Sequence, residues 1–251
     1  MRYYRETATL KNLLNLKLWI PQFKSLESLN SALRIYKDLN KDNKSADVAI
    51  TLNMMGSIYN SFGDSRKSIE YQEKSLKVFK ELSGDKPVHE SPHANDIAST
   101  IQNIGVAYDE LGEEQKAIDK FEEALRIYEK ISEGSVKQLH VASCLGNIAM
   151  PHKDLKQFDK AVEYLNKAMS MYKTIHKNNQ HHPDIAKMQY RLSLVYKDQN
   201  DRKKAVESLD MALEMYKTEY SSNTVNLELP KAYNNIGLYF FLFLLVFKKK
   251  I

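Results

Sequence analysis

The segment HESPH places His89, Glu90 and His93 in the zincin pattern H-E-x-x-H. In that pattern two histidines one helical turn apart bind Zn²⁺ from one face of a helix. Pro92 inside the segment and Pro87 just before it disfavour a continuous helix, and no third ligand is evident. We therefore interpret the pattern as a coincidence in a linker, and keep a metal-dependent hydrolase that uses these three residues only as an alternative function.

Cys144 is the single cysteine and the next candidate for chemistry. A catalytic thiolate needs a paired histidine and an electropositive setting, and only His140, one turn earlier, is near it in sequence. We expect Cys144 to be a buried small hydrophobic residue, and His181 and His182 to lie in a solvated linker. The chain also lacks the phosphate-binding glycine loops and the G-x-S-x-G nucleophile motif. These patterns predict a non-catalytic protein with no metal or cofactor.

The composition limits both the fold and the partners. The 37 basic and 32 acidic side chains give a net charge of +5, and three of the excess positive charges are the terminal residues 248–250. No basic run interleaved with aromatics occurs elsewhere, so a nucleic-acid partner is not predicted. With 8 glycines and 6 prolines in 251 residues, the chain has too few turn residues for a β-sandwich or barrel. A single cysteine excludes an intramolecular disulfide and fits a reducing, cytoplasmic location.

A repeat organises the whole chain. A column of small residues recurs at spacings of 43, 49, 44 and 44 residues. Its members are Ala32, Ser75, Ala124, Ala168 and Ala212, and an aromatic ring follows each of them four residues later. Apolar residues around this column are separated by three, four and seven positions, which is the pattern of one helix face. Each copy therefore predicts an amphipathic helix.

A second helix is predicted before each of these. Asp47, Asp96 and Asp184 stand at its expected start, where an aspartate can cap free backbone N–H groups. A second column of small residues lies inside this helix and consists of Gly56, Gly105, Ala149 and Ser193. Because a glycine within a helix costs about 1 kcal/mol relative to alanine, its recurrence predicts a close approach of the neighbouring helix. Gly63 and Gly112 mark the turn between the two helices.

These columns resemble the tetratricopeptide repeat, most clearly over residues 103–128. The spacing of about 44 residues exceeds the usual period of about 34 and resembles the long repeats of kinesin light chains and nephrocystin-like proteins, most clearly over residues 182–217. The resemblance implies an all-α, right-handed superhelical solenoid of about five helix-turn-helix units in one domain, residues 4–247. The copies are expected at about 4–44 (degenerate), 47–86, 96–134, 140–180, 184–222 and 228–247 (incomplete).

The resemblance also implies that the first helix of each pair lines a concave groove. The groove candidates are Asn53, Gln102, Asn103, Asn147, Lys187, Arg191, Lys197, Asn234 and Asn235. Side-chain amides donate and accept hydrogen bonds, so they can pair with the backbone of an extended peptide. Asn147, Lys187 and Arg191 match three positions of a five-residue clamp that grips a peptide carboxylate in some co-chaperones, whereas Gln102 and Val106 depart from it. A weaker patch for acidic groups, made by Lys187 and Arg191 with Lys197 as a further candidate, is still predicted, because arginine pairs with carboxylates through two hydrogen bonds.

The predicted function is a scaffold that binds an extended, acidic peptide segment of a partner protein, as a motor-cargo or signalling adaptor. A tail-anchored membrane scaffold is the other alternative, because residues 238–247 are ten consecutive apolar residues followed by three lysines. A helical span needs about 20 residues, so we favour a truncated gene product over an anchor and expect membrane contact only if the 238–250 tail is genuine. No oligomeric state follows from these patterns.

Overall fold

A computed structural model of the chain describes residues 24–36, 38, 44–131 and 135–221. All elements in these ranges are helical, which confirms the all-α prediction. A helix over residues 24–36 precedes α2 (Ala46–Ser61), α3 (Ser65–Ser83), η1 (Val88–Glu90), α4 (Ala94–Glu110), α5 (Glu114–Lys130), α6 (Ser135–Asp154), α7 (Phe158–Ile175), α8 (Pro183–Asp198) and α9 (Arg202–Ser221). The predicted incomplete copy at 228–247 and most of the degenerate copy at 4–44 lie outside the described residues.

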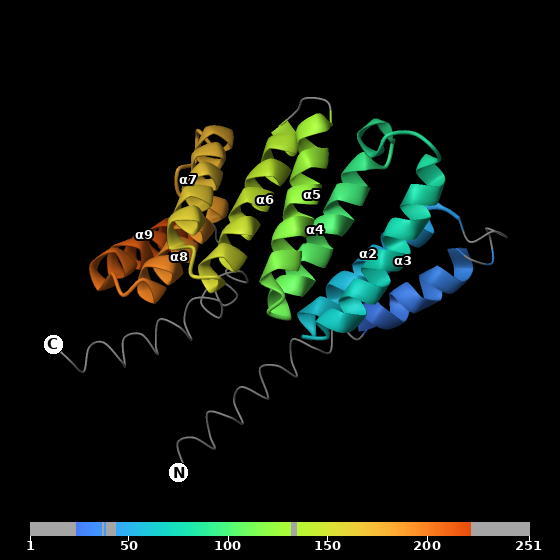
Figure 1. Ribbon diagram of the computed structural model, residues 1–251, viewed down its shortest axis with the longest axis horizontal. Helices are drawn as coiled ribbons and strands as arrows, with labels where there is room; N and C mark the ends of the chain where they lie inside the picture. Colours follow the sequence, from blue (N-terminus) through green and yellow to red (C-terminus); the bar gives the residue numbers. More distant parts are fainter. Residues whose placement is uncertain (1–23, 37, 39–43, 132–134, 222–251) are drawn as a thin grey trace, which may run out of the picture. The chain divides into compact units, whose positions relative to one another are not determined.

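The helices belong to two compact units, the first ending at Leu155 and the second beginning at Lys156. In the first unit α2 and α3, and α4 and α5, are antiparallel pairs joined by short turns, as are α8 and α9 in the second unit (Figure 1). In the first unit α2, α4 and α6 form one layer, while α3 packs on α2 and α4 and α5 packs on α4 and α6. These stacked helix pairs form a solenoid, as predicted. A single domain over residues 4–247 stays a prediction.

Close helix crossings occur at the two columns of small residues. A Cβ atom built on Gly105 would lie 2.7 Å from two ring carbons of Phe121, and one built on Gly56 would lie 2.6 Å from Nε2 of Gln72. Real Cβ atoms essentially never approach so closely, so a side chain at Gly105 would displace the Phe121 ring, and one at Gly56 would displace the side chain of Gln72. Ala124 in the second helix of the pair is also completely buried. The prediction of a close approach is therefore confirmed.

The turns within the helix pairs share a left-handed residue. Gly63 and Gly112 have φ angles of 77° and 71°, and Lys156 and Asn200 take the same place in the later copies with φ angles of 58° and 62°. At Gly63 the backbone N–H donates to the carbonyl of Asn60, and the next N–H donates back to that of Tyr59, the two bonds of a Schellman motif. The turn geometry thus persists where the glycine does not.

The predicted aspartate caps are wrong in position. Asp47 and Asp96 lie in the first turns of α2 and α4, where a negative charge favours the helix dipole. The cap of α2 is instead Ser45, whose hydroxyl accepts the backbone N–H of Val48 at 3.3 Å. An aspartate does cap the second helix of two pairs, since Asp64 accepts the N–H of Lys67 and Asp201 that of Lys204, both at 3.1 Å. The sequence therefore shows that aspartates stand near the helix starts, but not which helix of a pair they cap.

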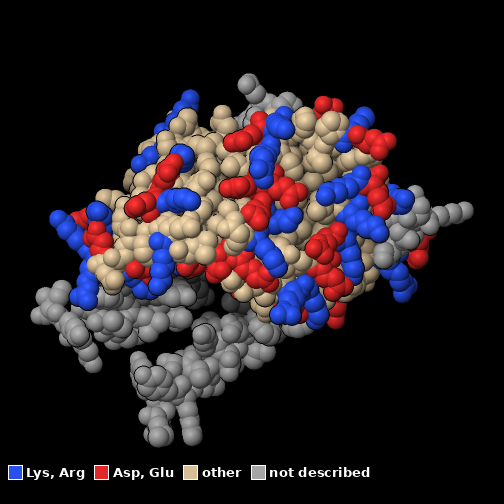
Figure 2. Space-filling view, viewed as in Figure 1, with Lys and Arg blue, Asp and Glu red and all other residues tan. Residues whose placement is uncertain are grey.

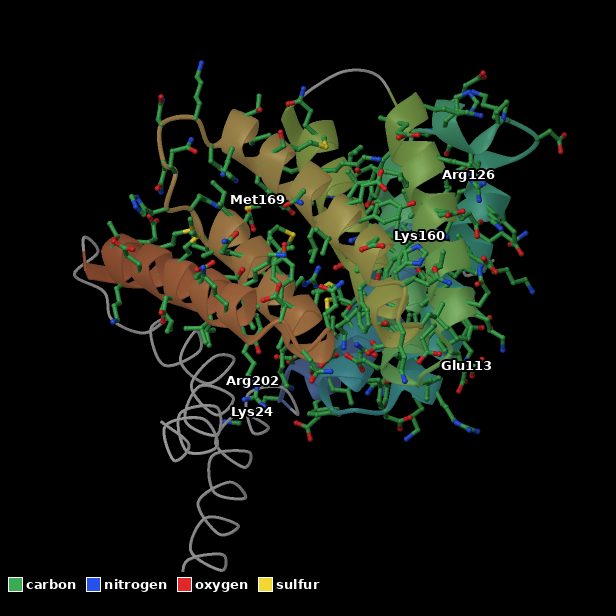
Figure 3. All side chains as sticks on the ribbon, turned by 60° about the vertical axis from the view of Figure 1, so that its left-hand side comes forward. Lys24, Glu113, Arg126, Lys160, Met169 and Arg202 are labelled. Atoms are coloured by element: carbon green, nitrogen blue, oxygen red, sulfur yellow. The ribbon has the colours of Figure 1, made fainter. Side chains whose placement is uncertain are left out.

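A lysine in the first turn of the second helix recurs with the turn. Lys67, Lys116 and Lys204 lie 5.2, 5.3 and 5.4 Å from the ring centroids of a tyrosine in the preceding helix. Lys116 also pairs with Glu113, which precedes α5 and lies at the opposite end of that helix from Arg126 (Figure 3). These exposed pairs contribute little energy each, but they show that the repeat extends to surface residues.

Candidate functional site

Two of the predicted groove amides meet in the first unit. Asn53 of α2 donates to Oγ1 of Thr100 at 3.1 Å and accepts a hydrogen bond from Nδ2 of Asn103 at 3.0 Å. The same Nδ2 reaches Oγ of Ser57 at 3.5 Å, and the backbone carbonyl of Asn53 accepts from Nε2 of Gln72 at 3.2 Å. Asn53 and Asn103 therefore join α2 to α4, a role that the sequence analysis did not predict.

The same arrangement recurs between α4 and α6, the next two first helices. Nε2 of Gln102 donates to Oγ of Ser143 at 3.0 Å, and its Oε1 accepts from Sγ of Cys144 at 3.4 Å. Cys144 follows Thr100 by 44 residues and thus occupies the same repeat position, so equivalent amides bind equivalent partners on the next helix. We name Asn53, Gln102 and Asn103 the amide ladder. Its signal in the sequence is the repeat spacing, which aligns Asn53 with Thr100 and Gln102 with Cys144, in each case a small polar residue of the next copy.

A shallow groove of about 330 Å³ opens beside the start of the amide ladder. Asn53, Met54, Ser57, Ile58 and Asn103 line it. Met54 is 51% exposed, so an apolar side chain borders the groove at the surface. The groove therefore offers amide groups and an apolar wall together.

Two predicted basic residues lie in the second unit, one turn apart on α8. Desolvation lowers the pKa of Lys187 and the neighbouring Arg191 charge lowers it further, whereas Asp184 acts in the opposite direction. Lys197 follows Arg191 by six residues, about 120° around a helix of 3.6 residues per turn, so it lies off the face of the other two. Lys187 and Arg191 therefore share a face of α8, and an acid-binding patch that includes Lys197 stays a prediction.

The remaining groove candidates are Asn147, Asn234 and Asn235. Asn147 lies half-buried on α6. Asn234 and Asn235 lie outside the described residues, as does the apolar tail at 238–250. Within the described ranges no helix combines the length and apolar character needed to cross a membrane.

Cys144 is unsuited to nucleophilic chemistry. Its side chain is fully buried, as predicted, and burial raises the pKa of the thiol to about 12. His140 does not activate it, because the imidazole stacks on Tyr128 with ring centroids 4.7 Å apart and an interplanar angle of 5°. Burial lowers the pKa of His140. Both side chains serve the packing of α5 on α6.

The HESPH residues do not assemble a metal site. A short 3₁₀ turn ends at Glu90, and His93 lies against Phe79 with ring centroids 5.5 Å apart. Nε2 of His89 lies 3.7 Å from Oε1 of Glu90. The interruption of the helix at this segment agrees with the two prolines, and the zincin geometry is not formed.

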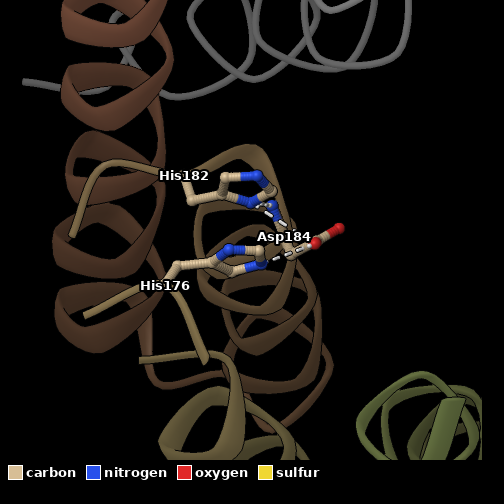
Figure 4. A group of neighbouring side chains, drawn as sticks. All are labelled: His176, His182 and Asp184. Carbon is tan, nitrogen blue, oxygen red and sulfur yellow. Dashed lines mark hydrogen bonds and ion pairs between the residues drawn. The ribbon is translucent and has the colours of Figure 1, made fainter. Parts of the chain in front are cut away.

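A cluster that the sequence analysis missed lies between α7 and α8 (Figure 4). Nε2 of His176 and Nδ1 of His182 lie 3.1 and 3.3 Å from the same oxygen, Oδ2 of Asp184. The prediction of a solvated linker holds for the exposed His181 but is wrong for His182, because its ring stacks on that of His176 at a centroid distance of 3.4 Å. The spacing H-x₅-H-x-D was the available signal.

Charge does not separate into large fields on the face shown in Figure 2. There Lys and Arg alternate with Asp and Glu over the described residues. Such mixing resembles an ordinary solvated surface rather than a phosphate-binding footprint. The chemistry of the described surface is therefore concentrated in the groove, the basic pair on α8 and the histidine cluster.

Three sequence models of the Tetratricopeptide repeat match the chain, over residues 49–81, 97–133 and 141–218, which together span more than half of its length. No curated protein matches by sequence.

Several solved structures share the fold. The kinesin light chain TPR-like repeats of Podosopora anserina superpose with a TM-score of 0.57 at 16% identity, over 79% of this chain and 88% of that chain. The apo form of RapI gives 0.63 at 18% identity, over 81% and 69%. A Rap protein complexed with Competence and Sporulation Factor gives 0.57 at 16% identity, over 80% of this chain and 52% of that one.

Proposed function

Because the chain belongs to the tetratricopeptide repeat proteins, we propose that it is a non-catalytic scaffold that binds an extended segment of a partner protein. The observation that carries the proposal is the groove beside the amide ladder, where amide and apolar groups share one surface. The binding site in the first unit consists of Met54, Ser57, Ile58 and Asn103, with Asn53 behind them.

The groove provides both interactions that an extended peptide needs. Met54 and Ile58 stand one turn apart on α2 and offer a pocket wall for an apolar side chain. Asn103 donates through Nδ2 to Asn53 and Ser57, and its Oδ1 would accept a backbone N–H of the peptide. Since the ladder fixes the amide, the peptide does not have to order it on binding.

Structures of the same fold support a peptide as the ligand. The Rap protein described above is complexed with Competence and Sporulation Factor, and a Rap conjugation gene regulator is in complex with the Phr* peptide, with a TM-score of 0.53. At 16% and 20% identity these structures support the type of ligand and not its sequence.

The preference for acidic peptides rests on the second unit. Lys187 and Arg191 place two positive groups one turn apart on α8, and an arginine pairs with a carboxylate through two parallel hydrogen bonds. A motor-cargo or signalling adaptor acting in the cytoplasm is the version that the kinesin light chain similarity favours.

Selection of peptides from a random displayed library on the purified full chain tests the proposal. We expect Met54→Glu to weaken the selected peptides at least tenfold, because it places a charge in the apolar wall. Val206→Glu is the matched control, since Val206 is another exposed apolar residue, on α9, and should leave affinity unchanged. Failure to select any peptide, or equal affinity in the Met54→Glu chain, would refute the groove.

The acidic preference is tested separately. If carboxylates pair with the α8 residues, the double variant Lys187→Ala/Arg191→Ala should weaken acidic peptides and remove the salt dependence of their binding. Neutral peptides selected in parallel provide the control, and should bind the parent and double variant alike. An unchanged salt dependence would restrict the proposal to the groove of the first unit.

A further inference from the structure

The geometry points to a binding site for a divalent transition-metal ion, best matched by Zn²⁺, made by His176, His182 and Asp184. It lies within the second unit and does not depend on the proposed peptide groove. Residues 176–182 link α7 to α8, so the ion would hold the end of one helix to the beginning of the next.

The first support is the spacing of the candidate ligand atoms. Asp184 Oδ2 lies 3.1 Å from His176 Nε2 and 3.3 Å from His182 Nδ1, and one ligand atom from each residue lies within 4.8 Å of the others. Ligands held at about 2.0–2.1 Å by a tetrahedral ion lie about 3.3–3.4 Å from one another. The two distances to Asp184 Oδ2 therefore already match the spacing of ligands around one tetrahedral ion.

The second support is that each imidazole turns a nitrogen toward Asp184 (Figure 4). The rings are stacked with an interplanar angle of 11° and centroids 3.4 Å apart, so the imidazoles have to rotate out of this stack to point both lone pairs at one ion. Nδ1 of His182 also accepts the backbone N–H of Asp184 at 3.3 Å, a bond that requires the tautomer with a lone pair on Nδ1. In that tautomer the lone pair faces a carboxylate oxygen, and a cation between them would remove the repulsion. On metal binding, Nδ1 of His182 would give up its 3.3 Å hydrogen bond from the backbone N–H of Asp184 and coordinate the ion instead.

Burial favours the neutral form of His182, and a histidine that binds a metal must be neutral. Burial lowers the pKa of His182 and the nearby His176 lowers it further, against opposing effects of Asp184 and Glu219. The His176 side chain is 17% exposed and that of Asp184 38%, so the ligands are partly enclosed but reachable from solvent.

The linker is also fixed around the proposed ligands. Asn179 donates to Oε2 of Glu219 at 2.7 Å, which ties the linker to α9. His176 caps the end of α7 and His182 precedes α8, so two of the three ligands are placed by helix ends. Three protein ligands leave the fourth tetrahedral position for water or a further carboxylate.

The donor set selects the class of metal. Imidazole suits Zn²⁺, Ni²⁺, Cu²⁺ and Co²⁺, whereas Mg²⁺ and Ca²⁺ prefer sites made of oxygen atoms. The proposal is therefore a nitrogen-rich transition-metal site that Mg²⁺ does not occupy.

The test uses the untagged full chain, stripped with chelator and titrated with ZnCl₂ by calorimetry. We expect one Zn²⁺ per chain, no heat with MgCl₂, and a higher melting temperature of the zinc-loaded chain. Adding CoCl₂ should produce the visible absorption of a tetrahedral Co²⁺ site. His176→Ala and Asp184→Asn should each weaken Zn²⁺ by about 100-fold or more, because changes to groups behind metal ligands alone cost about 10–100-fold.

Controls separate loss of the site from loss of the fold. His181→Ala removes the exposed histidine of the same linker and should keep full affinity. His182→Asn retains a side chain that can cap α8, so its circular dichroism should match the parent while Zn²⁺ binding is lost. Absence of saturable Zn²⁺ binding, equal affinity in the His176→Ala chain, or an equal loss in the His181→Ala chain would overturn the proposal and leave the cluster as a hydrogen-bonded helix cap.

Discussion

The two units use one repeat pattern with different polar residues. In the first unit neighbouring first helices are joined by amides, as where Asn53 reaches Asn103 and Thr100. In the second unit the noteworthy polar contacts lie in the linker, where His176 and His182 converge on Asp184. The comparison teaches that the repeat specifies helix spacing and turn geometry, and leaves the polar positions open for separate functions.

The largest expected effect comes from overfilling the helix crossing that occurs within each unit. Ala124 in α5 and Ala168 in α7 are completely buried, so leucine at either position inserts three carbon atoms where no space exists. We expect each variant to lose about 3 kcal/mol of unfolding free energy, the upper end of the usual cost of overpacking. Urea denaturation followed by helical circular dichroism measures it.

The exposed positions Arg126 and Ser170 on the same helices are the controls, and leucine there should change stability little. An Ala124→Leu chain as stable as the parent would mean that this column is not the helix crossing.

The next effect distinguishes the two units at one repeat position. Gly105→Ala places a Cβ atom 2.7 Å from the buried Phe121 ring, and the resulting shift should outweigh the gain in helix propensity. We expect a net loss of about 1–2 kcal/mol by urea denaturation. Ser193 holds the same position in α8, so Ser193→Ala should stay within about 0.5 kcal/mol of the parent. Equal changes in the two variants would contradict the idea that close packing requires the glycine.

The turns should respond in opposite directions. Lys156 has a φ of 58°, which is unfavourable for a residue with a Cβ atom, whereas Gly112 at 71° is not strained. We expect Lys156→Gly to stabilise the chain by about 1 kcal/mol and Gly112→Ala to destabilise it by about the same amount. Thermal unfolding compares the two, and a melting temperature lowered by Lys156→Gly would show that strain at this turn is offset elsewhere.

Much of the fold was predictable because it depends on periodic features. Small residues such as Ala124 and Gly105 recur at fixed spacings, and steric packing gives such a column only one explanation. The amide ladder was only half predictable. The sequence located Asn53 on the right face, but hydrogen bonds between copies depend on the distance between helices, which the spacing within one copy does not contain.

The histidine cluster, in contrast, could not be predicted from periodic features of the sequence. His176 and His182 belong to a linker, where no periodic pattern tells which side chains converge. Their contact depends on how α7 ends and α8 begins, which is a property of the backbone path. HESPH was recognised as a coincidence on the same ground, because a motif counts only when its residues share the helix that the motif assumes.

The smallest expected effect is on pH dependence, and it concerns His140 in the first unit. Burial lowers the pKa of His140 below its ordinary value of 6.5, so the unfolded chain binds more protons than the folded chain at mildly acidic pH. Above about pH 6.5 the imidazole is neutral in both the folded and the unfolded chain, so it does not change the free energy of unfolding. Below about pH 6.5 the unfolded chain takes up the proton more readily, so the free energy of unfolding falls.

His140→Phe keeps a ring to stack on Tyr128 and removes the titration. Between about pH 7 and pH 5 we expect urea denaturation of this variant to show a shallower loss of stability than the parent. His181→Phe in the exposed part of the second linker is the control and should keep the parent slope, whereas an unchanged slope in His140→Phe would assign the acid sensitivity to other groups.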